Sequence, residues 1–161
     1  MDWNENFKQK MNQYALSNSE SMIPISIKIR PSGGCFHREH SPQAYQIIDN
    51  YIESHPTNDY IFEEHETGPE IISMISAGIN ITSSVINFIT AIIKARTEGI
   101  RRGDHKDAPL ELIIRGYDKK GNLKQEEILT IKSWQEIDDE LIEKVISVSI
   151  EKLFFSKKKE K

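Results

Sequence analysis

Residues 69–102 of the chain read PEIISMISAGINITSSVINFITAIIKARTEGIRR and contain its longest stretch without a charge. From Ile71 to Ile93 no side chain is charged, and isoleucine is the most frequent residue. Proline suits the first turn of a helix, and Glu70 beside it suits the positive end of the helix dipole. Several cations follow the uncharged stretch, where the negative end of the dipole would lie. We therefore predict one continuous helix over residues 69–94, fraying beyond it at Gly99.

The polar residues of this stretch recur at spacings of three and four, which is the period of a helix. They are Ser73, Ser76, Asn80, Ser83, Asn87, Thr90 and Lys94. An uncharged run of this length also meets the length criterion for a transmembrane helix, so a membrane-associated protein anchored through helix 69–94 is one alternative. The regular polar stripe favours instead a helix that packs on a sheet and keeps one side near water.

The apolar side of the predicted helix is wider than one small sheet can cover. Exposed apolar surface of this kind usually marks an interface with another protein. We therefore predict that this helix contributes to protein binding, through the residues Ile75, Ile79, Ile86 and Ile89.

A second amphipathic segment occupies residues 2–16. Trp3, Phe7, Met11 and Tyr14 are spaced by four, four and three residues and form a single apolar stripe. Turn-forming residues 17–21 follow and end the pattern. The segment is predicted to be a helix that packs on its own domain or binds a partner, and its candidate protein-binding residues are Trp3, Phe7 and Met11.

Composition describes one domain of ordinary polarity. Of the 161 residues, 29% are charged and 37% are hydrophobic, and the net charge of −4 creates no field that would attract nucleic acid. The single cysteine allows no internal disulfide, and the N-terminus lacks the features of a secretory signal, so we expect a cytoplasmic protein. The predicted divisions are an N-terminal helix and linker at 1–20, one domain at 21–155 and a basic tail at 156–161.

The remaining segments alternate between strand and helix patterns. Strands are predicted at 25–30, 60–64, 110–115 and 123–132, with a hairpin at Gly121, and helices at 42–54 and from Gln135 onward. Ser41 is expected to cap the helix that begins at Pro42. The predicted fold is therefore an α/β (α+β) two-layer sandwich: a four-stranded mixed sheet in the order β-α-β-α-β-β-α, with an extra N-terminal helix.

Cys35, His37 and His40 place three metal-ligand side chains within six residues of a loop. Zinc takes four protein ligands in structural sites, or three and a water in catalytic sites, and the spacing points to no fourth residue. A thiol nucleophile at Cys35 lacks a third group to orient the histidine. A small zinc-dependent enzyme or metal-binding protein that uses this loop is therefore the alternative function.

Other charged clusters have simpler explanations. Glu63, Glu64, Glu66 and Glu70, with His65 among them, precede the predicted long helix, whose dipole accounts for them. The basic residues from Lys94 to Lys106 are not interleaved with aromatics, so we expect no nucleic-acid partner. No phosphate-binding loop or dinucleotide motif occurs, and we expect no cofactor.

The layout from Ile25 to Phe155 resembles the effector-associated constant component family of bacterial conflict systems. The resemblance lies in the order of features: a short alternating strand, a helix, a strand leading into Gly68-Pro69-Glu70, an unusually apolar segment, a basic stretch, a hairpin and a closing helix. It covers about four-fifths of the chain and implies a non-enzymatic adaptor beside or fused to an effector, such as a caspase-like or trypsin-like peptidase. The N-terminal helix and the loop at Gly33-Gly34-Cys35 depart from the pattern, and the family supplies no functional residues to carry over.

From these observations we expect a non-enzymatic protein–protein interaction module that couples to an effector protein in a bacterial defence or signalling system. Its expected partner is a protein, with self-association as the alternative.

Overall fold

The structure is a computed structural model that describes residues 9, 23–32, 36–65, 67–75, 82–104, 109–117, 120–132 and 136–155. The predicted N-terminal helix at 2–16, except for Gln9, and the basic tail at 156–161 lie outside these residues. The described elements, in chain order, are β1 (Ile23–Pro31), α2 (Pro42–Ser54), β2 (Tyr60–Glu63), β3 (Glu70–Ile75), α3 (Ser83–Arg101), β4 (Leu110–Tyr117), β5 (Leu123–Ile131), α4 (Asp139–Ile150) and a short π-helical turn, η1 (Glu151–Phe155).

The five strands form one sheet in the order β2-β3-β1-β4-β5, and every neighbouring pair is antiparallel. The predicted α+β class is confirmed, but the predicted four-stranded mixed sheet is wrong. Each strand–helix–strand unit does contain two parallel strands, yet a third strand lies between them. β3 separates β1 from β2, and β1 separates β3 from β4, so the parallel strands among the described elements are not hydrogen-bonded to each other.

The continuous helix predicted over residues 69–94 is also wrong, because Glu70–Ile75 is strand β3 and the helix begins only at Ser83. β3 pairs with β1 on one edge and β2 on the other, and all six of its residues are buried. A strand covered on both faces reads as an uninterrupted apolar run, which periodicity cannot distinguish from a buried helix. The apparent polar stripe therefore joins residues of two different elements.

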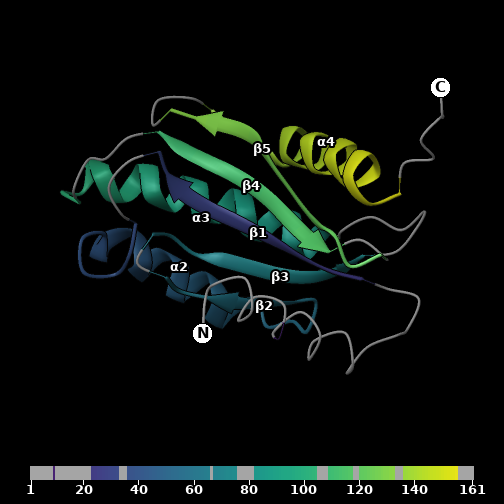
Figure 1. The fold of residues 1–161 in the computed structure, drawn as a ribbon. Coiled ribbons are helices and arrows are strands. Elements are labelled where there is room, and N and C mark those ends of the chain that lie inside the picture. Colours follow the sequence, from purple (N-terminus) through teal and green to yellow (C-terminus); the bar gives the residue numbers. More distant parts are fainter. Residues whose placement is uncertain are drawn as a thin grey trace.

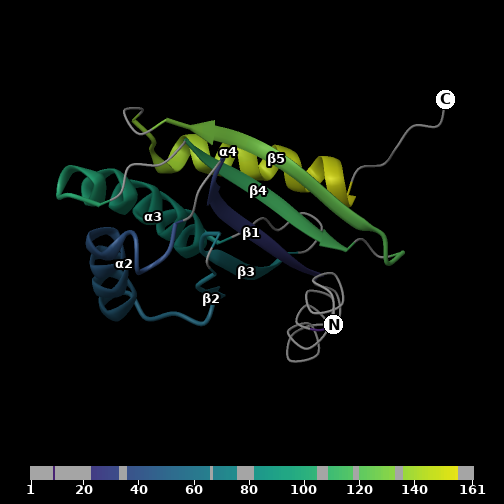
Figure 2. The same cartoon turned by 60° about the vertical axis from the view of Figure 1, so that its left-hand side comes forward.

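Helices α2, α3 and α4 all pack on the same face of the sheet (Figures 1 and 2). Alternate residues of β1, including Ile25, Ile27 and Ile29, point into this layer and are fully buried. α3 contributes Phe88, Ile89 and Ile92 to the same core, and Phe88 stacks on Tyr60 with ring centroids 4.8 Å apart. The amphipathic pattern of α3 is thus satisfied inside the domain.

The opposite face of the sheet, here called the second face, has a different character. It carries Ile72, Met74 and Ile113, which are buried but lie outside the main core cluster. Between them are the buried polar side chains Ser26, Lys28, Glu70 and Arg115. Buried charges require partners, so this face holds a specific polar network.

The N-terminus of helix α2 is capped by a residue that is distant in the sequence. Ser41 makes no side-chain capping bond, contrary to expectation. Instead the carboxylate of Asp104, just beyond α3, accepts the backbone N–H groups of Gln43 and Ala44, each at 2.9 Å. The end of α3 thereby stabilises the start of α2.

Within the residues that the structure describes, no helix is both long and apolar enough to cross a membrane.

Candidate functional site

Three titratable side chains gather where β2 turns into β3. Glu63 ends β2 and Glu70 begins β3, and the two residues face each other in the antiparallel register. His65 lies in the connecting turn, with Nε2 3.1 Å from Glu63 Oε1 and 3.0 Å from Glu70 Oε1. One imidazole nitrogen thus contacts two carboxylates. We call these three residues the Glu–His–Glu cluster.

The backbone of the turn is closely constrained. The Gly68 N–H donates to the His65 carbonyl at 3.0 Å, and the Ile29 N–H donates to the Pro69 carbonyl at 3.0 Å. Gly68 has φ +137°, and a Cβ on it would lie 2.0 Å from the carbonyl oxygen of Ile29. Only glycine fits this position, so the turn that presents His65 is fixed by the sequence.

The second carboxylate oxygen of Glu70, Oε2, accepts two hydrogen bonds. Ser26 Oγ donates to Oε2, and Arg115 Nη2 donates to the same oxygen at 3.2 Å. Burial by itself would raise the pKa of Glu70, but the hydrogen bond from Ser26 and the charge of Arg115 outweigh it, so the pKa lies below its ordinary value. Glu70 is therefore an ionised carboxylate whose Oε1 is directed at His65.

Lys28 supports the same turn from β1. Its ammonium donates to the Gly68 carbonyl at 2.9 Å. Burial lowers the pKa of Lys28 to about 8, although the charge of Glu70 partly counteracts this. The cation thus contacts the backbone of the turn.

Sequence reasoning assigned these acids to a helix dipole, and that explanation is wrong because no helix begins at Glu70. One sequence signal was available. Glu63 and His65 are two residues apart, which places both side chains on the same side of an extended chain. Their approach to Glu70 depends on the strand pairing and could not be read from the spacing.

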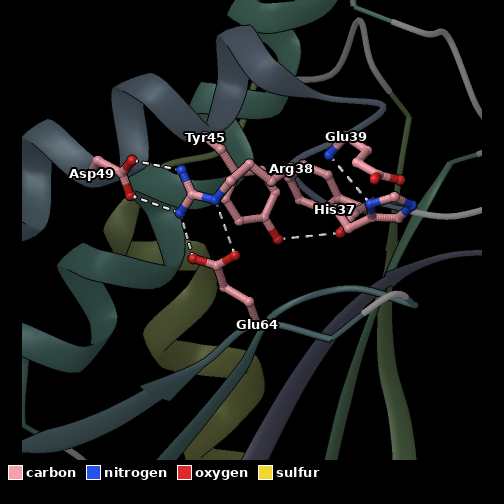
Figure 3. Close-up of polar contacts among 7 residues, drawn as sticks. His37, Arg38, Glu39, Tyr45, Asp49 and Glu64 are labelled. Atoms are coloured by element: carbon pink, nitrogen blue, oxygen red, sulfur yellow. Dashed lines mark hydrogen bonds and ion pairs between the residues drawn. The ribbon is translucent and has the colours of Figure 1, made fainter.

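Arg38, in the loop of the predicted metal site, links this loop to α2 and to the end of β2 (Figure 3). The Arg38 guanidinium bonds both oxygens of Asp49 on α2, at 2.7 and 3.1 Å, and both oxygens of Glu64 after β2. It also lies over the Tyr45 ring, 5.1 Å from its centroid. The loop, α2 and the end of β2 are thereby joined, and the chain that carries Glu63 and His65 is anchored through Glu64.

His37 and His40 lie close together in this loop, with ring centroids 4.7 Å apart. Nδ1 of His37 accepts the backbone N–H of Glu39 at 3.3 Å. Cys35 lies outside the described residues, so metal binding by Cys35, His37 and His40 stays a prediction.

The predicted protein-binding residues divide into two groups. Ile75, Ile86 and Ile89 are buried in the core of the domain. Trp3, Phe7, Met11 and Ile79 lie outside the described residues. Binding by any of them stays a prediction, but replacing the first three would disturb packing before it reported on a partner.

A groove between β5 and α4 offers a surface that sequence reasoning did not identify. It has a volume of about 240 Å³ and is lined by apolar and charged residues. The apolar members are Ile128, Val145 and Val148, and the Val148 residue is 61% exposed. Among the described residues, β5 pairs only with β4, so its outer edge borders the groove without a neighbouring strand.

Two hydrogen bonds join the two walls of the groove. Glu126 on β5 accepts hydrogen bonds from Ser149 Oγ on α4 at 3.0 Å and from Lys152 Nζ on η1 at 2.6 Å. The groove therefore has a defined width.

Comparison with models of known protein families, with curated protein sequences and with solved structures finds no match to this chain.

Proposed function

We propose that this domain is a non-enzymatic protein-binding module that receives an extended segment of a partner protein along β5. The observation that carries the proposal is the outer edge of β5, nine residues long, beside the exposed Val148 of α4. An edge strand next to an apolar groove allows a partner to add a strand, with main-chain hydrogen bonds for affinity and side-chain pockets for specificity.

The two edges of the sheet differ in their suitability. β2 has only four residues, whereas β5 has nine. A strand added beside β5 would also cover the groove, burying Val148 together with the half-buried Ile128 and Val145. Full burial of an exposed aliphatic side chain contributes roughly 1.5–3 kcal/mol, and Ile128 and Val145 would contribute less than this because they are already half-buried.

The side chains of the groove describe the partner segment. Its lining combines the apolar residues with exposed charged residues of both signs, Glu127 and Lys144. A strand with small aliphatic residues on one side and polar residues of both signs on the other is complementary to these features. The occupant is therefore an alternating apolar–polar segment.

The biological setting follows from the resemblance to the effector-associated constant component family. We propose that the partner is an effector protein of a bacterial defence or signalling system, encoded beside this protein, and that the module couples the effector to its trigger. The residues Trp3, Phe7 and Met11 are proposed as a second contact in the same assembly.

The test is isothermal titration calorimetry with the neighbouring effector protein. Val148→Lys puts a charge into the groove and should weaken binding at least tenfold, which corresponds to about 1.4 kcal/mol. Glu143→Lys is the matched control, because Glu143 is exposed on the same helix but does not line the groove. It should bind as the unmodified protein does.

Two results would contradict the proposal. Equal affinity of the Val148→Lys variant and the unmodified protein would remove the groove as the binding surface. Absence of binding to the neighbouring effector would remove the proposed adaptor role.

A further inference from the structure

We propose that Glu63, His65 and Glu70 bind one divalent transition-metal ion, for which Zn²⁺ is the best match. The ligand atoms would be Glu63 Oε1, His65 Nε2 and Glu70 Oε1. Zinc accepts imidazole and carboxylate ligands together, and a set of three protein ligands leaves a fourth position for water or a substrate atom. This site is separate from the groove at β5, and its three ligands are not those of the predicted Cys35, His37 and His40 set.

The spacing of the ligand atoms suits a metal ion. The three atoms lie within 4.8 Å of one another, and the two contacts of His65 Nε2 are 3.0 and 3.1 Å. Metal–ligand bonds of about 2.0–2.2 Å place two ligands of a tetrahedral ion roughly 3.4 Å apart. Reaching that geometry would require small rotations of the Glu63 and His65 side chains, both of which are partly exposed.

The backbone presents the ligands from rigid elements. Glu63 and Glu70 are paired residues of neighbouring strands, and His65 is held in the turn closed by Gly68. On the other side of β2, Arg38 binds Glu64 and fixes the strand end. A ligand set carried by paired strands and a constrained turn is preorganised for binding.

Glu70 has the support that a metal-binding carboxylate needs. Its Oε2 receives hydrogen bonds from Ser26 and Arg115, while Oε1 contacts His65. Hydrogen bonds of this kind orient a ligating carboxylate without occupying the ligand atom. Arg115 and Lys28 lie behind the site and offset the cost of burying the ionised Glu70.

The strand register supplies an independent reason for a cation. Glu63 and Glu70 are directly opposite each other on one face of the sheet. Like charges in this position destabilise a sheet unless a cation lies between them. The imidazole nitrogen of His65 contacts both carboxylates, and a metal ion bound to this nitrogen would bring both of them into its coordination shell.

The open side of the site faces solvent. The side chain of His65 is 34% exposed, whereas that of Glu70 is 5% exposed. An ion could therefore enter past His65 while Glu70 anchors it from within the sheet. A bound zinc ion would differ from the sequence-based expectation that the protein has no cofactor.

The experiment titrates the metal-free protein with zinc chloride alone, by isothermal titration calorimetry. We expect one equivalent of Zn²⁺ to bind. His65→Ala and Glu63→Gln should each weaken binding by more than about 100-fold, since even an outer hydrogen-bond partner of a metal ligand contributes 10–100-fold. Substitution with Co²⁺ should produce the visible absorption of a tetrahedral site, and His65→Ala should abolish it.

His40→Ala is the matched control, because it removes an imidazole from the other histidine-containing loop. It should leave the affinity and the cobalt spectrum unchanged. Circular dichroism should show that His65→Ala folds normally, because His65 is partly exposed; if it does not, Glu63→Gln carries the same test.

Three results would overturn the inference. Absence of zinc binding would show that the cluster does not hold a metal ion. Loss of binding in His40→Ala would move the site to the Cys35 loop. Unchanged binding in both His65→Ala and Glu63→Gln would exclude the Glu–His–Glu cluster.

Discussion

Arg115 on β4 donates a hydrogen bond of 3.2 Å to Glu70 on β3, across the full width of the intervening strand β1. Ser26 on β1 donates to the same carboxylate oxygen, so one buried acid links the three central strands. The contact is far from local, since 45 positions separate Glu70 from Arg115.

Replacing Arg115 by methionine should lower the free energy of unfolding by about 3–5 kcal/mol, because it leaves the Glu70 carboxylate buried without its cation. Adding Glu70→Gln to this variant should restore at least about 1 kcal/mol, since the unpaired charge is then removed. Urea unfolding monitored by circular dichroism measures both changes. Arg30→Met is the control. Because Arg30 forms an exposed pair with Glu111, this substitution should lower the free energy of unfolding by less than about 1 kcal/mol. Equal losses of stability in Arg115→Met and Arg30→Met would show that burial does not strengthen the contribution of the Arg115–Glu70 pair.

Gly68→Ala should destabilise the domain by more than the strain of a positive φ alone, which is roughly 1–3 kcal/mol. The added Cβ would meet the Ile29 carbonyl oxygen at 2.0 Å, which requires the turn to move away from β1. Gly103→Ala is the matched control, because Gly103 also has a positive φ but no atom within 4 Å of the added Cβ. The difference in thermal midpoint between the two variants measures the clash, and identical midpoints would contradict it.

Asp104→Ala should cost about 1–2 kcal/mol, because it removes the cap from the first turn of α2. Ser41→Ala, at the position where sequence reasoning placed the cap, should cost less than about 0.5 kcal/mol, since Ser41 makes no side-chain capping bond. Asp104→Asn keeps an acceptor oxygen and should recover part of the loss. Denaturant unfolding ranks the three variants, and a larger loss for Ser41 than for Asp104 would reverse the assignment of the cap.

Ile89→Ala should cost about 2–5 kcal/mol, because Ile89 is fully buried between α3 and the sheet. Val148→Ala, at the exposed position in the groove, should cost less than about 0.5 kcal/mol. Chemical denaturation measures the loss of stability in each variant. A negligible effect of Ile89→Ala would mean that this residue is available for a partner, as the sequence alone predicts.

The contact between Glu126 and Lys152 should make a small, pH-dependent contribution to stability. The hydrogen bond from Lys152 holds the pKa of Glu126 below its ordinary value of 4.5, against the opposing effect of burial and with help from Ser149. The contribution is therefore complete above pH 4.5 and is lost as the pH falls through the lowered pKa. Lys152→Ala should reduce stability by less than about 1 kcal/mol at neutral pH, because the pair is partly exposed. The deficit should shrink below pH 4, and a deficit that persists at pH 2 would exclude this electrostatic origin.

Much of the secondary structure could be predicted from local patterns. Helix α2 begins at Pro42 and ends at Ser54 as predicted, and β1, β2, β4 and β5 lie within two residues of their predicted bounds. Each of these segments has its own period or turn signal, so neighbouring residues carry enough information. β3 has none, because a strand covered on both faces and a buried helix share the same composition.

The site was harder to predict than the elements, for a related reason. Glu63 and His65 are close in sequence, but Glu70 and Arg115 join them only through the order of strands in the sheet. Because β3 was not predicted from the sequence, the order of the strands could not be predicted either, and the acids were assigned to a helix dipole. The Asp104 cap was missed in the same way, since its carboxylate comes from the end of a different helix.

The position of β1 at the centre of the sheet has a consequence for synthesis of the chain. β1 is the first described strand, but its two partners are β3, which begins at Glu70, and β4, which ends at Tyr117. One edge of β1 therefore remains without its partner until Ile75 has been made, and the other edge until Tyr117 has been made. Unpaired edges of this kind promote aggregation of nascent chains. Ser26, Lys28 and Arg30 keep one side of β1 polar before it pairs. Ser26 and Lys28, which later belong to the buried network, therefore also protect the chain before it folds.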